Sequence, residues 1–139
     1  ILSINGLNSK AEIIAGTYKG IKGPADTFSP LLLFNLHLSE GTEEEMELPS
    51  HYNTGLLIVN GSVELNNENK VAQDHFVLMK NDAGKIKVKA EEDCTVLVLS
   101  GKALEEPVFA HGPFLMNTRE EIIQAFEDYE SGKFGYLED

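Results

Sequence analysis

The stretch LPSHYNTGLLIVNGSVEL, from Leu48 to Leu65, is the part of the chain that most directly indicates its fold. It passes from a histidine through an apolar run to Asn60 and Gly61, and a second apolar run follows. Asn-Gly tolerates the positive φ of a tight turn, so the pattern predicts a strand, a hairpin turn and a second strand. The histidine at the entrance raises the question of a metal site in a small β-barrel.

Segments of similar character lie on both sides, among them LLLFNLHL, GKIKVKA and DCTVLVLS. In the first, Phe34, Leu36 and Leu38 alternate with Asn35 and His37, which predicts one buried face. In the second, lysines alternate with apolar residues, and the third is a nearly continuous apolar strand. About seven short strands at roughly ten-residue spacing predict an all-β sandwich or barrel.

The end of the chain has a different period. NTREEIIQAFEDYESGKFG predicts one α-helix, with Thr118 as its N-cap and Glu121 completing a capping box. Gly132 is a suitable stop after the helix, and the apolar stripe comprises Ile122, Ala125, Phe126 and Tyr129. We therefore expect a linker or interdomain segment at 1–10, a barrel at 11–116, the helix at 117–135 and a tail at 136–139.

Composition limits the function classes. The 139 residues carry a net charge of −12 with a pI near 4.7, so neither a nucleic acid nor an anionic membrane surface is an expected partner. The apolar runs are shorter than the ~20 residues of a membrane span, and we expect a cytoplasmic protein. Cys94, the single cysteine, lies in an apolar run and is expected to be a buried thiol.

The opening stretch can be compared with the metal box of a cupin barrel, which has two histidines one residue apart, a glutamate soon after and a third histidine on a later strand. Counted from His51, the second histidine is replaced by Asn53 and the glutamate by Leu57. Counted back from the turn glycine, the ligand places fall at Glu47, Pro49 and Asn53, and GKIKVKA contains no histidine. We therefore expect no metal and no cofactor in this chain.

Several stretches together resemble the C-terminal half of the pirin-like bicupins: GIKGPADTFSPLLLFNLHL, LIVNGSVEL, LVLSGKALEEPVFAHGPFLMNTREEIIQAFEDY and SGKFG. The resemblance extends from about Ala11 to Gly135 and is most specific from Gly101 onward. It implies a cupin double-stranded β-helix, or jelly-roll barrel, with one C-terminal α-helix. In that family the N-terminal cupin holds iron through three histidines and a glutamate, and some members have quercetin 2,3-dioxygenase activity. Iron or another divalent metal would then belong only to an N-terminal domain that this sequence does not contain.

Three functional hypotheses follow. In the first, the chain is a metal-free structural and docking domain that packs against the N-terminal cupin of the same protein, or forms a homodimer through its C-terminal helix. Its docking residues would be His111, Phe114, Met116, Ile122 and Phe126, although the sequence also allows this helix to pack on its own barrel.

In the second hypothesis, the chain is a stand-alone, metal-independent cupin that binds a small ligand in the barrel mouth. The polar groups expected there are Asn35, His37, His51 and Asn53. In the third, the acidic surface contacts another protein, as the resemblance to pirin, a nuclear transcriptional cofactor, implies.

Overall fold

The computed structural model describes residues 2–5, 8–80 and 84–137. The strands are β1 (Leu2–Asn5), β2 (Ser9–Ala15), β3 (Thr17–Tyr18), β4 (Ile21–Lys22), β5 (Leu31–Leu38), β6 (Glu43–Glu47), β7 (Tyr52–Asn60), β8 (Ser62–Leu65), β9 (Asn69–Ala72), β10 (Phe76–Leu78), β11 (Lys85–Ala90), β12 (Cys94–Lys102), β13 (Phe109–His111) and β14 (Phe114–Met116), and the helix is α1 (Arg119–Glu130). The chain divides into two compact units, Ile1–Ala103 and Leu104–Asp139.

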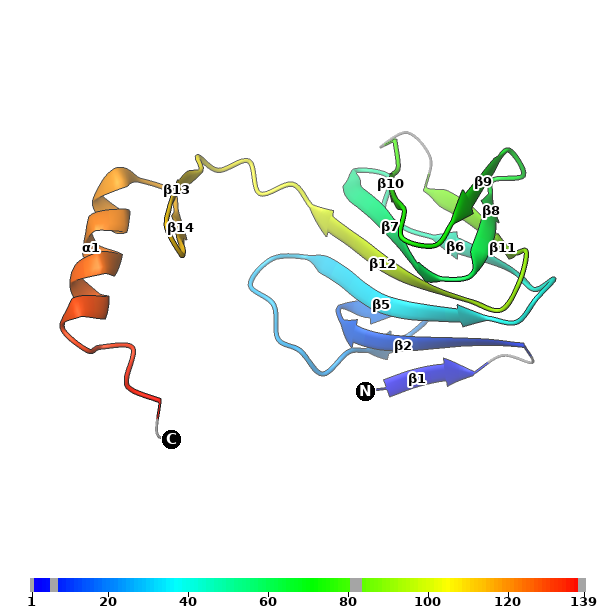
Figure 1. Ribbon diagram of the computed structural model, residues 1–139, viewed down its shortest axis with the longest axis horizontal. Helices are drawn as coiled ribbons and strands as arrows, with labels where there is room; N and C mark the ends of the chain where they lie inside the picture. Colours follow the sequence, from blue (N-terminus) through cyan, green and yellow to red (C-terminus); the bar gives the residue numbers. More distant parts are fainter. Residues whose placement is uncertain (1, 6–7, 81–83, 138–139) are drawn as a thin grey trace. The chain divides into compact units, whose positions relative to one another are not determined.

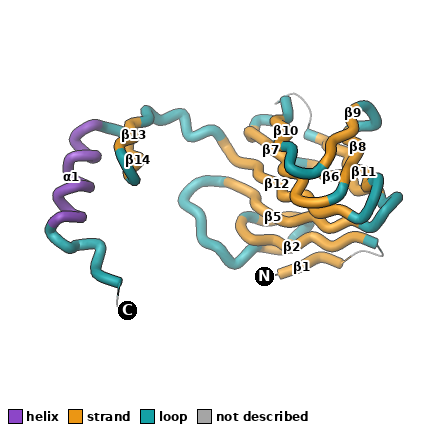
Figure 2. Tube along the Cα trace, in the orientation of Figure 1, coloured by secondary structure: helices purple, strands orange, loops and turns teal. Residues whose placement is uncertain are grey.

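The first unit is built from two main antiparallel sheets and a short two-stranded sheet, β3–β4 (Figures 1 and 2). The large sheet has the strand order β1-β2-β5-β12-β7-β10, and the small sheet has the order β6-β11-β8-β9. β12 pairs with β5 on one side and β7 on the other, although both precede it by a long stretch of sequence. This crossing order is that of a jelly-roll barrel and not of a simple meander.

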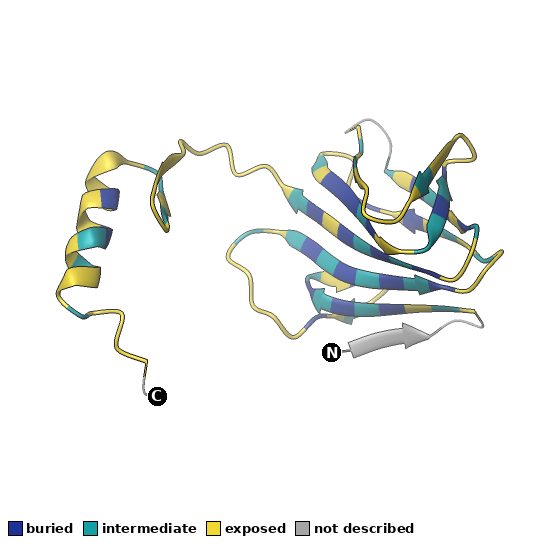
Figure 3. Ribbon diagram, viewed as in Figure 1, coloured by how far each residue is buried: buried dark blue, intermediate teal, exposed yellow. Residues whose placement is uncertain are grey.

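The apolar core lies between the two sheets. Phe34, Leu36 and Leu38 of β5 are buried, which confirms the predicted alternation of that strand, and Cys94 is a buried thiol as expected. Buried residues alternate with half-buried ones along β5, and with half-buried or exposed ones along most of β12 (Figure 3). The largest fully buried side chains are Ile13, Phe34, Leu36, Met46, Leu56, Ile58, Val63, Val88, Val96 and Val98.

The predicted hairpin at Asn60 and Gly61 is wrong. β7 and β8 do not pair with each other, because β7 belongs to the large sheet and β8 to the small one. Gly61 has a φ of +74°, and a Cβ there would lie 2.4 Å from the carbonyl oxygen of Asp93. The Asn-Gly pair thus makes a corner at which the chain passes from one sheet to the other, close to the start of β12.

The lysines of GKIKVKA lie on the outer face of the small sheet, while Ile86 and Val88, which alternate with them, enter the core. The neighbouring strand β6 presents glutamates to them. Lys87 forms an ion pair with Glu43 at 2.9 Å. This cross-strand pairing of opposite charges favours the observed register of β6 and β11.

The second unit consists of the β13–β14 hairpin and α1. Thr118 and Glu121 form the predicted capping box, and Gly132 follows the helix with a φ of +76°. The sequence assigned residues up to 116 to the barrel, but the contacts place β13 and β14 with the helix. The reason is that the β12 ladder ends at Lys102 and residues 103–108 are exposed.

The first ten residues also differ from the expected linker. Leu2–Asn5 forms β1, which pairs antiparallel with β2, and β2 itself begins at Ser9. In the part of the chain that the structure describes, no helix has the length and apolar character required to cross a membrane.

Candidate functional site

The outer face of the large sheet, turned away from the core, has a polar end and an apolar end. Along β5 the outward residues change from Leu31 and Leu33 to Asn35 and His37. The outward residues of the neighbouring strand β12 follow the same division. Leu99 pairs with Leu33 at the apolar end, and Thr95 pairs with His37 at the polar end. One continuous sheet face therefore carries apolar side chains at one end and polar side chains at the other.

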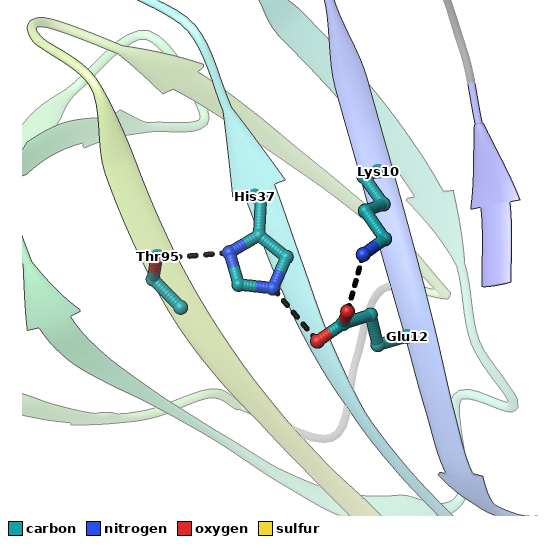
Figure 4. Close-up of polar contacts among 4 residues, drawn as sticks. All are labelled: Lys10, Glu12, His37 and Thr95. Carbon is teal, nitrogen blue, oxygen red and sulfur yellow. Dashed lines mark hydrogen bonds and ion pairs between the residues drawn. The ribbon is translucent and has the colours of Figure 1, made fainter. Parts of the chain in front are cut away.

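At the polar end, His37 lies between Thr95 of β12 and Glu12 of β2 (Figure 4). Its Nε2 lies 3.1 Å from Glu12 Oε2, and its Nδ1 lies 3.0 Å from Thr95 Oγ1. A carboxylate only accepts, so Nε2–H donates to Glu12, while Nδ1 shares a hydrogen bond with the Thr95 hydroxyl. The imidazole orientation is thus fixed by both neighbouring strands.

Lys10 completes this cluster. Its ammonium group donates to Glu12 Oε1, the other carboxylate oxygen. The hydrogen bonds from Lys10 and then His37 hold the pKa of the Glu12 carboxyl below its usual value. Glu12 is therefore an ionised acceptor shared by two donors from β2 and β5.

A shallow hollow of about 440 Å³ adjoins His37. Its lining is mostly polar, and beside it the backbone N–H of Glu40 donates to the Asp93 carboxylate at 2.8 Å. The other lining residues are Asn8, Ser9, Lys10, Leu38, Ser39, Asn60, Cys94 and Thr95. Its open form and mixed charges make it a hydrogen-bonding surface.

At the apolar end, a groove of about 410 Å³ runs over β5, β12, β7 and β10. Gly55 allows the Phe76 ring to lie directly on the sheet, because a Cβ on Gly55 would be 2.2 Å from Phe76 Cζ. We call the outward apolar residues of these four strands the outer apolar surface; they are Leu31, Leu33, Leu57, Phe76, Leu78, Leu97 and Leu99. The sequence signal for it was the continuity of the apolar runs, which lack polar residues on the second face.

The structure does not bring together the four residues expected at a barrel mouth. Asn35 and His37 point outward from β5, because the residues between and beside them fill the core. Asn53 pairs with Gly101 at the opposite end of the strands, about 20 Å from His37 at ~3.3 Å per residue. His51 is exposed before β7, with its ring 4.9 Å from that of Tyr52.

The described residues at the places compared with the cupin ligands do not form a metal site. The ligand places at Glu47, Pro49, His51 and Asn53 are all exposed, and Leu57 points outward. The inward polar groups of β7 and β12 at this level are Thr54 and Ser100, whose hydroxyl oxygens lie 2.7 Å apart. Among the described residues, no three His, Cys, Asp or Glu side chains are grouped to hold a metal ion.

The residues expected to dock through the C-terminal helix mostly contact one another. Phe126 packs edge-on against Phe114 and His111, with ring centroids 4.9 and 5.6 Å away. Ile122 is buried and Met116 half-buried, while His111 is exposed. A groove of about 330 Å³ between β13 and α1 is lined by several of them and by Ile123 and Arg119.

Comparison with known proteins agrees with this architecture. The sequence pattern of the pirin C-terminal cupin domain matches residues 33–135. A pirin-like protein of Caulobacter vibrioides is 35% identical over 125 residues, which cover 88% of this chain and 45% of that protein. Pirin of Mus musculus is 31% identical over 128 residues, covering 89% of this chain and 44% of pirin.

A solved structure of a quercetin 2,3-dioxygenase from Acinetobacter baumannii superimposes with a TM-score of 0.87 at 34% identity, covering 96% of this chain and 46% of that one. The chain thus spans less than half the length of the relatives that it matches. The jelly-roll barrel with one helix is the cupin fold that the sequence resemblance implied.

Proposed function

The chain belongs to the pirin family, whose C-terminal cupin domain it matches, and from that membership we propose that it is a metal-free docking domain. Its partner is an N-terminal cupin domain of the same protein. That domain, and not this chain, carries iron-dependent chemistry of the quercetin 2,3-dioxygenase kind. The relatives, which are more than twice as long as the matched segment, support this assignment.

The observation that carries the proposal is the identity and exposure of the residues at the places of the cupin metal ligands. Iron in a non-haem oxygenase requires imidazole and carboxylate ligands converging on one point with open positions left over. Here His51 and Glu47 are both exposed, and the interior at this level contains the Thr54–Ser100 hydroxyl pair. Among the residues that the structure describes, no group of His, Cys, Asp and Glu side chains offers a donor set for iron, which supports the proposal.

The test is metal loading and oxygen consumption by the purified chain. We expect far less than one iron per chain after anaerobic incubation with Fe(II) and gel filtration, measured by mass spectrometry of the metal content. Dioxygen uptake with quercetin should not exceed that of Fe(II) in buffer. Stoichiometric iron that is lost in His51→Ala but retained in His75→Ala, another exposed histidine, would overturn the proposal.

A further inference from the structure

We propose that Thr95, His37 and Glu12 form an acyl-transfer site for small esters. Thr95 is the nucleophile, His37 is its general base, and the hollow of about 440 Å³ beside His37 holds the ester. This inference goes beyond the docking function, because it gives the polar end of the large sheet a chemistry of its own.

The hydrogen bonds among these three side chains are the first argument. Nδ1 of His37 lies 3.0 Å from Thr95 Oγ1, and its Nε2 lies 3.1 Å from Glu12 Oε2 (Figure 4). A hydroxyl bonded to an imidazole whose other nitrogen is oriented by a carboxylate is the arrangement that activates serine and threonine nucleophiles. The two ring nitrogens have exchanged places relative to a serine protease triad, but each has the partner that its role requires.

The charge of Glu12 suits the orienting role. The hydrogen bonds from Lys10 and then His37 lower the pKa of the Glu12 carboxyl, which favours the ionised form that accepts the Nε2 proton. A neutral imidazole with its proton on Nε2 carries its lone pair on Nδ1, the atom that faces the Thr95 hydroxyl. His37 is therefore oriented to take the proton of Thr95.

The surrounding groups come from one row of residues across the large sheet. His37 pairs with Lys10 of β2 on one side and with Thr95 of β12 on the other. Thr95 pairs in turn with Asn60 of β7, and all four residues line the hollow. The His37 side chain is 38% exposed and Thr95 is half-buried, so a small ester can reach both.

Asn60 adds a donor for the negative charge that develops on the ester oxygen. Within the part of the chain that the structure describes, its side-chain amide has no hydrogen-bond partner, and the residue is exposed beside Thr95. Asparagine amides are common donors to the oxyanion of acyl-transfer reactions. The row thus brings together a nucleophile, a base and an oxyanion donor.

The transfer proceeds in two balanced steps. In the first, Thr95 Oγ1 bonds to the carbonyl carbon, its proton passes to His37 Nδ1, and the alcohol leaves with that proton as the C–O bond breaks. In the second, water attacks the acyl group on Thr95 and gives a proton to Nδ1, and Thr95 Oγ1 leaves with that proton. Ester and water become carboxylic acid and alcohol, with no change of oxidation state.

The experiment measures acetylation of this chain by p-nitrophenyl acetate. We expect release of p-nitrophenolate and, after acid quenching, an acetyl group on Thr95 that peptide mass spectrometry locates. Neutral hydroxylamine should remove this group, because it cleaves esters and not the amides that form on lysines. Thr95→Val, which keeps the shape of the side chain without its hydroxyl, should lose the adduct, and Thr95→Ser should retain it.

Two histidine variants separate this chemistry from the ordinary reactivity of imidazole. His37→Ala should slow acetylation of residue 95 roughly a hundredfold, within the usual contribution of a general base. His75→Ala is the matched control, because the His75 ring is exposed and bonded to the backbone carbonyl of Gln73 and not to a carboxylate. Its rate should equal that of the native chain.

Each other outcome overturns the inference. A native chain without acetyl-Thr95 has no such nucleophile, and phenolate release that Thr95→Val leaves unchanged comes from another group. Equal acetylation rates in the native and His37→Ala chains exclude His37 as the base. None of these results affects the metal test of the proposed function, because no step of the transfer uses iron.

Discussion

Single residues decide where the strands of this barrel can approach one another. Gly61 brings the β7–β8 corner against Asp93 and Cys94, and Gly55 accepts the Phe76 ring onto the sheet. On the polar end, Glu12 joins Lys10 and His37 through one carboxylate. These positions are specified by contact geometry and not by the apolar pattern around them.

Gly61→Ala should destabilise the barrel more than a positive φ alone explains. A left-handed backbone costs a non-glycine residue about 1–2 kcal/mol, and the added Cβ would also meet the Asp93 carbonyl at 2.4 Å. Gly41→Ala is the matched control, because Gly41 has a φ of +76° but open space around it. Urea unfolding should show the larger loss for Gly61→Ala, and equal losses would refute the role of the contact.

The Glu12 cluster should make stability depend on pH in acid. Because the folded pKa of Glu12 lies below its reference value of 4.5, its stabilising contribution is complete above that pH and is lost as the pH falls through the folded pKa. The difference in unfolding free energy between the native chain and Glu12→Gln should therefore shrink as the pH falls below about 4.5. Chemical unfolding from pH 3 to 7 measures it.

Glu68→Gln, on the exposed β8–β9 turn outside this cluster, is the control for that titration. A Glu12→Gln difference that is constant over the whole pH range would exclude stabilisation of the Glu12 carboxylate by the hydrogen bonds from Lys10 and His37.

At the scale of elements, the strands differ in how many faces they cover with apolar residues. β11 alternates lysine with buried Ile86 and Val88, whereas β12 presents Leu97 and Leu99 outward as well as a buried side inward. The start of helix α1 is determined by its capping box. The Thr118 hydroxyl accepts a hydrogen bond from the Glu121 N–H, and the Glu121 carboxylate accepts one from the Thr118 N–H. Its local stability can be tested apart from the barrel.

Thr118→Ala should weaken the start of α1 by about 1 kcal/mol, the usual value of an N-cap, through loss of the acceptor for the Glu121 N–H. Amide hydrogen exchange in the first turn of the helix should become roughly fivefold faster. Thr118→Ser, which keeps the hydroxyl, should remain close to the native rate. Equal acceleration in both variants would point to the lost methyl group instead of the cap.

At the scale of the whole molecule, the sequence predicts the fold class but not the order in which the strands pair within the two sheets. The alternation in β5, the lysine face of β11 and the capping box followed from local periodicity, and the family resemblance supplied the jelly roll. Asn60 and Gly61 were misread as a hairpin because a positive φ suits a corner between sheets as well as a turn within one.

The candidate site was less predictable for the same reason. The alternation correctly separates Asn35 and His37 from the core side of β5, but no local pattern distinguishes an outer sheet face from a barrel mouth. The bonding of His37 to Glu12 and Thr95 depends on β2 and β12 flanking β5, which is a matter of strand order. Strand order comes from long-range pairing, and no local period encodes it.

The central position of β12 also determines when the large sheet can form during translation. β5 and β7 have no strand between them until Cys94–Lys102 has emerged, so the large sheet stays open while the intervening segments are translated. At roughly 5–20 residues per second, translating the segment between β7 and β12 takes on the order of seconds. During that time the edges of β5 and β7 that later pair with β12 have no hydrogen-bonding partner. A message truncated before this strand would yield a chain with no means of closing its sheet, and therefore a natural client for chaperones.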